Sequence, residues 1–297
     1  MDNELYEGHI LMEQGRMDHQ ESDIKGALLK FSRALEIYQR CKDDKNTALA
    51  LRSIGIMHDI QGQYDQALNY FYRAVVLQEV IQDTENLGRT LGNIGIIYQE
   101  KGDLDKALTY YKRSVTLCES SQDETLIIWS LSLLASLLSK KKSYLEAEGI
   151  YMQMLAFHQR YGAQGSEGVT WGNMGTMFYE QGDWSKAKEM LKRAVKLCDG
   201  IIVIASGLFR GTLGSIYAKE GNFEKALEYT EKAIELVSSE PQRLGRVLCS
   251  KTQILLQMNN KELAHQTLLE AKNIATSLSI GDEAALVIHI KETEALF

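Results

Sequence analysis

The sequence predicts an all-α fold, built from a helix pair that is repeated along the chain. Three observations support this prediction. Small residues recur about every 40 positions, an alanine recurs at one fixed place in each repeat, and the 297 residues include a single proline, Pro241. Because proline disrupts helix interiors, its scarcity fits long helices joined by short turns.

The first helix of each predicted pair is marked by a small residue. The series advances in steps of 40, 40, 40, 40, 39 and 38 through Gly15, Gly55, Gly95, Ala135, Gly175, Gly214 and Thr252. Seven positions later stand Gly62, Gly102, Gly182 and Gly221, with Ser22, Lys142 and Asn259 as departures. The first position lets the two helices approach closely, and the second is where the first helix ends in a left-handed turn.

The second helix is marked by an alanine in every repeat. The series is Ala27, Ala67, Ala107, Ala147, Ala187, Ala226 and Ala264. Asp103, Asp183 and Asn222 directly follow the turn glycine, where their side chains can cap the second helix. Two first helices place apolar residues on one face, and we expect these residues in the core: Leu91, Ile94, Gly95 and Tyr98, then Trp171, Met174, Gly175 and Phe178.

This pattern resembles the tetratricopeptide repeat over nearly the whole chain. The resemblance implies one right-handed solenoid over residues 1–297, with repeats at about 8–47, 48–87, 88–127, 128–167, 168–206, 207–244 and 245–279. Residues 280–297 are expected to form a capping helix with Ala285, Leu286, Ile288 and Leu296 as apolar anchors. The fourth repeat has lost both glycines, so the stack is expected to bend or change there.

The Leu91-Gly92-Asn93 tripeptide and a period longer than the common 34 residues or so narrow the resemblance. With these two features the chain resembles Leu-Gly-Asn repeat adaptors, kinesin light chains and bacterial peptide-sensing regulators. This implies a non-enzymatic scaffold that binds an extended peptide or helix of a partner protein in its concave groove. The alternative is a ligand-gated receptor for a small peptide. An adaptor is favoured because such receptors usually carry an N-terminal effector domain, whereas these repeats begin near residue 8. An accessory subunit that uses the convex face is a third alternative.

In such proteins the outward positions of the first helices reach the ligand. The resemblance assigns this role to Arg52, Arg89, Gly92, Asn93, Ser132, Ser136, Gly172, Asn173, Thr176, Gly211, Thr212, Arg246, Ser250 and Gln253. A glycine inside a helix costs up to about 1 kcal/mol relative to alanine. We interpret Gly92, Gly172 and Gly211 as clearing the groove floor for a partner backbone, which Asn93 and Asn173 can hydrogen-bond. Repeat drift on a non-binding face is the open alternative.

Other functional classes find little support. The net charge is −7 and no basic stripe is present, which argues against nucleic-acid partners. No secretory signal and no apolar run of about 18 residues occur, so we expect a cytoplasmic protein without membrane insertion.

Catalytic and metal sites are not indicated either. Cys41, Cys118, Cys198 and Cys249 form no CxxC pair and are expected to be buried free thiols. The six histidines are scattered over different repeats, and His58 takes a core position. The sequence therefore predicts no cofactor, no metal and no enzymatic activity.

Overall fold

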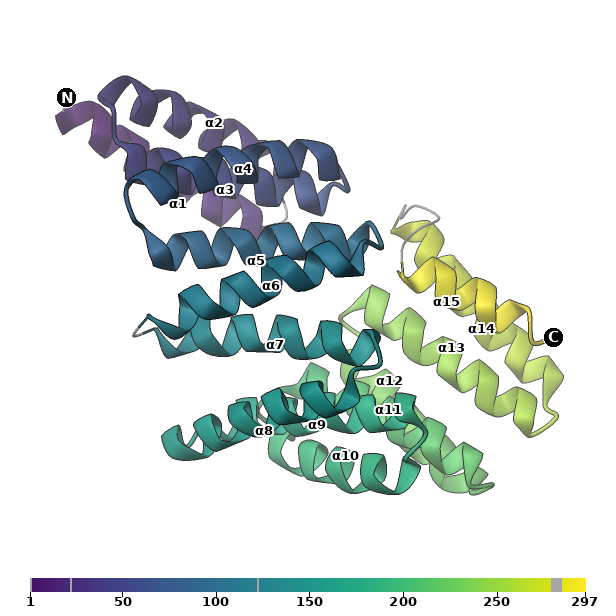
Figure 1. The fold of residues 1–297 in the computed structure, drawn as a ribbon. Coiled ribbons are helices and arrows are strands. Elements are labelled where there is room, and N and C mark those ends of the chain that lie inside the picture. The colour runs from purple at the N-terminus through teal and green to yellow at the C-terminus, as the bar shows by residue number, and fades with distance from the viewer. Residues whose placement is uncertain (1, 22, 122, 279–284) are drawn as a thin grey trace. The chain divides into compact units, whose positions relative to one another are not determined.

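A computed structural model describes residues 2–21, 23–121, 123–278 and 285–297. Within these ranges the chain forms fifteen helices and no strand (Figure 1), which confirms the all-α repeat fold. The chain divides into two compact units, an N-terminal unit of residues 1–147 and a C-terminal unit of residues 148–297. The boundary falls in α8 (Tyr144–Tyr161), the second helix of the fourth repeat.

The N-terminal unit stacks helix pairs. Its helices before α8 are α1 (Asp2–Gln20), α2 (Ile24–Cys41), α3 (Asp44–Ile60), α4 (Tyr64–Val80), α5 (Thr84–Glu100), α6 (Leu104–Glu119) and α7 (Glu124–Lys140). We call the odd-numbered helices up to α13 the helices A and the even-numbered ones the helices B. The helices α1, α3 and α5 each pack on the helix B that follows, and α5 also contacts α3 and α7, so these helices A lie side by side.

The C-terminal unit repeats this arrangement. After α8 come α9 (Gln164–Gln181), α10 (Trp184–Cys198), α11 (Val203–Lys219), α12 (Phe223–Val237), α13 (Pro241–Gln257), α14 (Lys261–Ser277) and α15 (Ala285–Glu294). Here α11 contacts both α9 and α13, and α15 packs on α13 and α14.

Helices A begin earlier than the sequence boundaries suggested. The helix α3 starts at Asp44 rather than at residue 48, and α5 starts at Thr84 rather than at residue 88. Asp43 and Asp83 explain the difference, because each side chain accepts a hydrogen bond from the backbone N–H three residues on, at 3.0 and 3.2 Å.

The turns inside the pairs are as predicted. Gly62, Gly102, Gly182 and Gly221 have φ values of 72°, 79°, 91° and 76°. Lys142 and Asn259 adopt the same left-handed conformation without a glycine, with φ of 62° and 59°. Ser22, the remaining departure, lies outside the described residues.

The predicted helix B caps are also present. Asp103, Asp183 and Asn222 each accept a hydrogen bond from the backbone N–H three residues on, at 3.1, 3.1 and 3.2 Å. These side chains satisfy N–H groups that have no partner within the helix.

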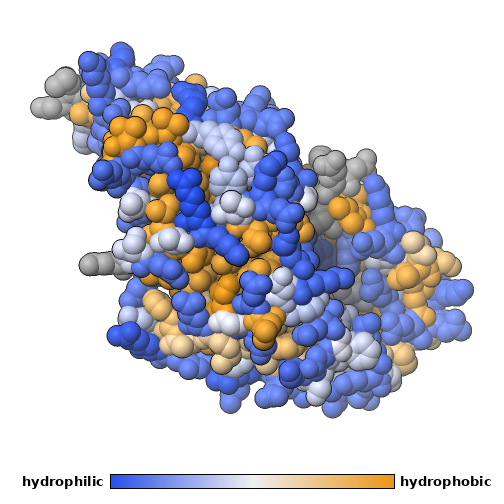
Figure 2. Space-filling model, in the orientation of Figure 1, coloured by the Kyte–Doolittle hydropathy of each residue, from blue (hydrophilic) through white to orange (hydrophobic). Residues whose placement is uncertain are grey.

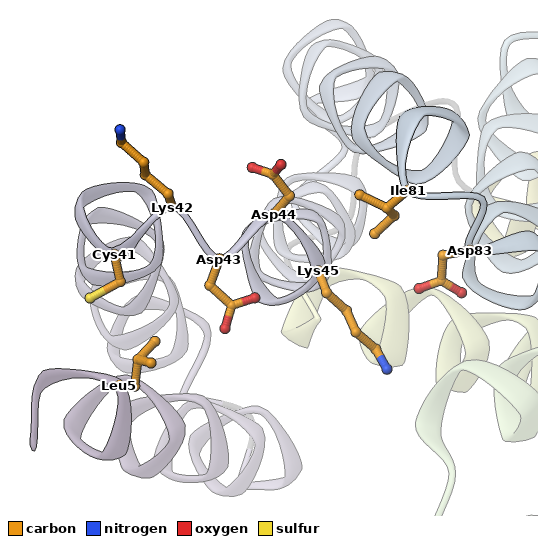
Figure 3. Close-up of a pocket in the computed structure, with 8 residues that line it drawn as sticks. All are labelled: Leu5, Cys41, Lys42, Asp43, Asp44, Lys45, Ile81 and Asp83. Carbon is orange, nitrogen blue, oxygen red and sulfur yellow. The ribbon is translucent and has the colours of Figure 1, made fainter. Parts of the chain in front are cut away.

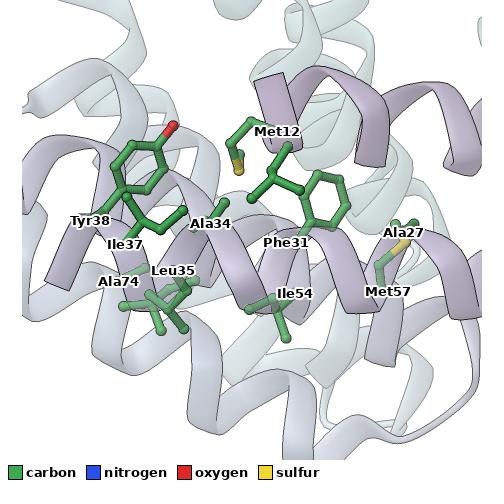
Figure 4. Close-up of a cluster of buried hydrophobic side chains, with 13 residues drawn as sticks. Met12, Ala27, Phe31, Ala34, Leu35, Ile37, Tyr38, Ile54, Met57 and Ala74 are labelled. Carbon is green, nitrogen blue, oxygen red and sulfur yellow. The ribbon is translucent and has the colours of Figure 1, made fainter. Parts of the chain in front are cut away.

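The core follows the repeat positions. Every alanine of the helix B series has 0% exposure. A methyl group added at Gly15 or Gly55 would lie 2.6 Å from the ring of Phe31 or Phe71, so these glycines do let the paired helices approach closely. Figure 4 shows the cluster around Phe31 in the N-terminal unit.

The predicted helix A core is largely confirmed. Leu91, Ile94, Met174 and Phe178 are at most 3% exposed, and Gly95 and Gly175 are buried as well. The aromatic residues Tyr98 and Trp171 are only half-buried.

The capping helix α15 buries a different face from the predicted one. Leu286 and Ile290 are 3% and 6% exposed and join a cluster with Leu248 and Leu268. Ile288 and Leu296 are 45% and 59% exposed, so their assignment as anchors was wrong. Leu286 and Ile290 are one helical turn apart and share a face that Ile288 does not. Residues 280–284 and the Ala285 side chain lie outside the described part.

The cysteines are free thiols. Cys118, Cys198 and Cys249 are buried, whereas Cys41 is only half-buried. Burial raises the pKa of Cys198 and of Cys249 to about 11, so both thiols are protonated at neutral pH. No helix in the described ranges is both long and apolar enough to cross a membrane.

Candidate functional site

The helices A of each unit present an outward surface, which we call the A-face. In the N-terminal unit it includes Arg52, Arg89, Asn93, Ser132 and Ser136, all half-buried or exposed. In the C-terminal unit it includes Asn173, Thr176, Thr212, Arg246, Ser250 and Gln253. Adjacent helices A contact one another within each unit, which brings these side chains onto one surface per unit.

The interior glycines of the helices A have a packing role, contrary to our interpretation. Gly92 is buried, and a methyl group there would collide with the indole ring of Trp129 on α7. Gly172 is buried in the same way under the ring of Phe209 on α11. These two glycines admit an aromatic ring from the next helix A rather than a partner backbone.

Gly211 differs from the other two. It is also buried, but the nearest atom to an added methyl group would be Cγ2 of Val247, at 3.6 Å. This is an ordinary van der Waals distance, so the site has room for a methyl group.

Arg89 connects two neighbouring helices A. Its guanidinium donates to Glu85 on α5 at 3.2 Å and to Asp123, the N-cap of α7, at 2.6 Å. The side chain keeps 33% exposure. Arg89 is therefore positioned by the protein's own carboxylates.

Arg52 has no such partner. Its Nε is buried, and no described residue accepts a hydrogen bond from it. Burial, with the neighbouring charges of Arg89 and Arg16, lowers the pKa of Arg52 to about 10. The group remains charged at neutral pH, and it is the side chain of the A-face least satisfied by the described residues.

The asparagines of the A-face are also available. Asn93 is half-buried and Asn173 is exposed, and neither side chain hydrogen-bonds another described residue. The hydroxyls of Thr176, Thr212 and Ser250 instead donate to carbonyls of their own helices, at 2.9, 3.4 and 3.3 Å.

The end of the A-face near α13 is partly covered. Nε2 of Gln253 donates to Oγ1 of Thr293 on α15 at 3.3 Å. The capping helix thus engages a side chain that we had assigned to a ligand, while Arg246 stays exposed.

On the face shown in Figure 2, surface hydrophobicity does not single out another site. The side shown in Figure 2 is mostly hydrophilic, with hydrophobic patches between the charged side chains, an ordinary pattern for protein surfaces. Within the described ranges, no group of three His, Cys, Asp or Glu side chains is placed to hold a metal.

A depression of about 720 Å³ lies at one end of the N-terminal unit (Figure 3). It is lined by Leu5, Cys41, Lys42, Asp43, Asp44, Lys45, Ile81 and Asp83. Asp43 and Asp83 are already used as helix caps, and the other polar groups are of mixed charge. The lining of the depression therefore does not present a cluster of side chains of one charge.

Sequence reasoning missed the residues that shape the A-face. Trp129 and Phe209 stand six and five positions before the marker residues Ala135 and Gly214, so a periodic alignment does not match them. Arg16 was missed as well, because its repeat position differs from that of Arg52. A search for large residues that compensate for interior glycines could have found the two aromatic residues.

Comparisons with known proteins agree with this fold. A model of the MalT-like TPR region matches residues 82–281, and a tetratricopeptide repeat model matches residues 7–79. No curated protein matches the chain. A solved tetratricopeptide repeat protein from Parabacteroides merdae is 17% identical, with 98% of each chain covered and a TM-score of 0.66.

Two further solved structures contain ligands. A Rap protein complexed with Competence and Sporulation Factor is 14% identical, covers 100% of this chain and 99% of its own, and has a TM-score of 0.62. NprR in complex with its cognate peptide NprX is 15% identical, covers 97% and 87%, and has a TM-score of 0.62. At these identities the similarity shows the fold. Because the first family model spans more than half of the chain, this protein belongs to the family with a MalT-like tetratricopeptide repeat region.

Proposed function

We propose that this protein is a non-enzymatic scaffold that binds an extended peptide or a helix of a partner protein along its A-face. The observation that carries the proposal is that polar side chains of the A-face, among them Arg52, Asn93 and Asn173, have no hydrogen-bond partner among the described residues. A polar group at a packed surface needs a hydrogen-bond partner, and a peptide backbone supplies donors and acceptors.

The fold comparisons support this class of ligand. The Rap and NprR structures contain Competence and Sporulation Factor and a cognate peptide, and their folds match almost all of this chain. The asparagine amide can donate and accept, so Asn93 in the N-terminal unit and Asn173 in the C-terminal unit each suit the N–H and C=O groups of a peptide backbone.

Affinity capture with paired variants tests the proposal. The bait proteins are the wild type, Asn93→Ala/Asn173→Ala, and the control Asn69→Ala/Asn273→Ala, whose exposed asparagines lie on helices B. Proteins or peptides retained by the wild type and the control but lost from the A-face variant support the proposal. Identical capture by all three baits contradicts it.

A second candidate is a ligand-gated receptor that senses a small peptide through the same face. It is favoured by the NprR similarity, because the matching structures include both the apo form and the form with a cognate peptide. Small-angle scattering of the chain with and without a captured peptide separates the two. A receptor should change its radius of gyration on binding, whereas an adaptor should keep it.

A further inference from the structure

The guanidinium of Arg52 is a partly buried positive charge on the A-face of the N-terminal unit. Its Nε is buried, and Arg52 has no hydrogen bond or ion pair with another described residue. Burying a charge without a partner is costly, so such a group calls for an explanation such as an ion or a ligand.

The two carboxylates whose charges act on Arg52 already form other bonds. Both oxygens of Asp83 accept hydrogen bonds from Asn86, at 3.2 Å from the backbone N–H and 2.8 Å from the side-chain amide. Glu85 is bonded to Arg89 at 3.2 Å. The charges of Asp83 and Glu85 raise the pKa of Arg52, although neither carboxylate forms a hydrogen bond with it.

The surrounding charges favour an incoming anion. Arg89 on α5 and Arg16 on α1 are the charged neighbours that most oppose a positive charge on Arg52. Arg16 itself is bonded to Glu13 at 2.5 Å, and Arg89 is bonded to Glu85 and Asp123. Each neighbour has its own carboxylate, and Arg52 alone of the three lacks one.

We propose that Arg52 anchors a carboxylate of the bound peptide, either an Asp or Glu side chain or the free C-terminus; this inference rests on the peptide-binding function proposed above. A single unpaired guanidinium matches a group with one negative charge, and the planar fork of arginine suits bidentate contact with a carboxylate. A phosphate dianion suits the site less, because the carboxylates that bond Arg16 and Arg89 would repel its charge.

The anchor also determines where the peptide lies. Asn93 projects from α5, the helix A that contacts α3, and its side chain is available. A peptide held by its carboxylate at Arg52 can place backbone amides over the neighbouring helix. We therefore expect the acidic group at one fixed distance from the segment that Asn93 binds.

A synthetic library of ten-residue peptides tests this anchor. It is screened in two arms, with free and with amidated C-termini, against the wild type, Arg52→Gln and the control Arg33→Gln. Arg33 is exposed on α2, so the control makes the same charge change on a helix B. We expect wild-type binders to share a carboxylate at one position and to lose about tenfold in affinity for Arg52→Gln, but not for the control. Binders found only in the free arm identify the C-terminus, and acidic binders in both arms identify a side chain.

A second readout does not depend on finding a peptide. The Nε–H resonance of Arg52 is followed by NMR while N-acetyl-aspartate amide is added, with N-acetyl-asparagine amide as the control. A saturable shift with the aspartate compound alone supports carboxylate binding at Arg52, even if the library yields no binder. Binders without an acidic preference that Arg52→Gln retains overturn the anchor and leave the scaffold function standing. No binders and no saturable shift overturn the anchor, whereas the scaffold function is decided by the affinity capture described above.

Discussion

The indole ring of Trp129 on α7 occupies the space that a side chain at Gly92 on α5 would need. The ring of Phe209 stands in the same relation to Gly172 in the C-terminal unit. Neighbouring helices A therefore meet through a small residue on one helix and a large residue on the next. Interiors are packed to crystal-like density, so the fit tolerates little added volume.

Alanine at the interior glycines should separate packing from helix propensity. Gly92→Ala and Gly172→Ala should each lower the free energy of unfolding by about 1–3 kcal/mol, because the methyl group overpacks the aromatic ring. Gly211→Ala should raise it by up to about 1 kcal/mol, since Val247 leaves room and alanine is the better helix former. Urea unfolding of the three variants measures the difference.

A compensating substitution provides the control. Trp129→Leu should restore stability to the Gly92→Ala variant, so the two changes should not be additive. Equal effects of all three alanines would show that the aromatic contacts are unimportant. Leucine at Gly92 or Gly172 is bulkier still, so these variants should be less stable than the alanine variants.

Local repeat chemistry is what made the fold predictable. The close approach at Gly15 and Gly55, the left-handed turn at Gly62 and the cap at Asp103 each depend on residues of one helix pair. These requirements recur in most repeats and leave the same residue types at the same spacing. The helix pairs can therefore be predicted from the sequence.

Contacts between repeats were not predictable in this way. The packing role of Gly92 depends on Trp129, which belongs to the next repeat and occupies no fixed repeat position. The Arg52 environment likewise depends on Arg16 and Arg89 from the two flanking repeats. Periodicity reveals the residues that the repeats have in common, whereas the candidate site depends on residues that differ between repeats.

The capping helix offers a second stability test. Leu286→Ala or Ile290→Ala should lower the free energy of unfolding by about 2–4 kcal/mol, because each side chain is buried against α13 and α14. Ile288→Ala should change it little, since Ile288 is 45% exposed. Denaturant unfolding followed by circular dichroism checks the series. A larger loss from Ile288→Ala than from Leu286→Ala would contradict this register of α15.

A half-buried carboxyl group on α3, that of Asp59, should make stability depend on pH. Burial, aided by the charge of Glu100, raises the pKa of Asp59 from 3.8 to about 6. The folded state therefore holds this proton more tightly than the unfolded chain does. Stability from this group is present below pH 4 or so and is lost as the pH rises through 6.

Asp59→Asn removes this titration. Its melting temperature should exceed that of the wild type by about 1–3 °C at pH 7, a modest effect because solvent still screens the group. The difference should vanish near pH 4, where both side chains are neutral. Melting curves between pH 4 and pH 8 measure it. A difference that stays constant over this range would show that the carboxyl titrates normally.

The two arginines of the A-face should respond to the same substitution in opposite directions. Arg52→Met removes a charge whose Nε is buried without a partner, so the free energy of unfolding should rise by about 1 kcal/mol. Arg89→Met breaks the bonds to Glu85 and Asp123 and should lower it, by less than about 1 kcal/mol because the pair is partly exposed. Thermal and urea unfolding of both variants at pH 7 provide the comparison. A stable Arg52→Met variant means that the wild type carries a destabilising group, as expected where a residue is kept for binding rather than for folding. Destabilisation by Arg52→Met would instead show that the arginine supports the fold.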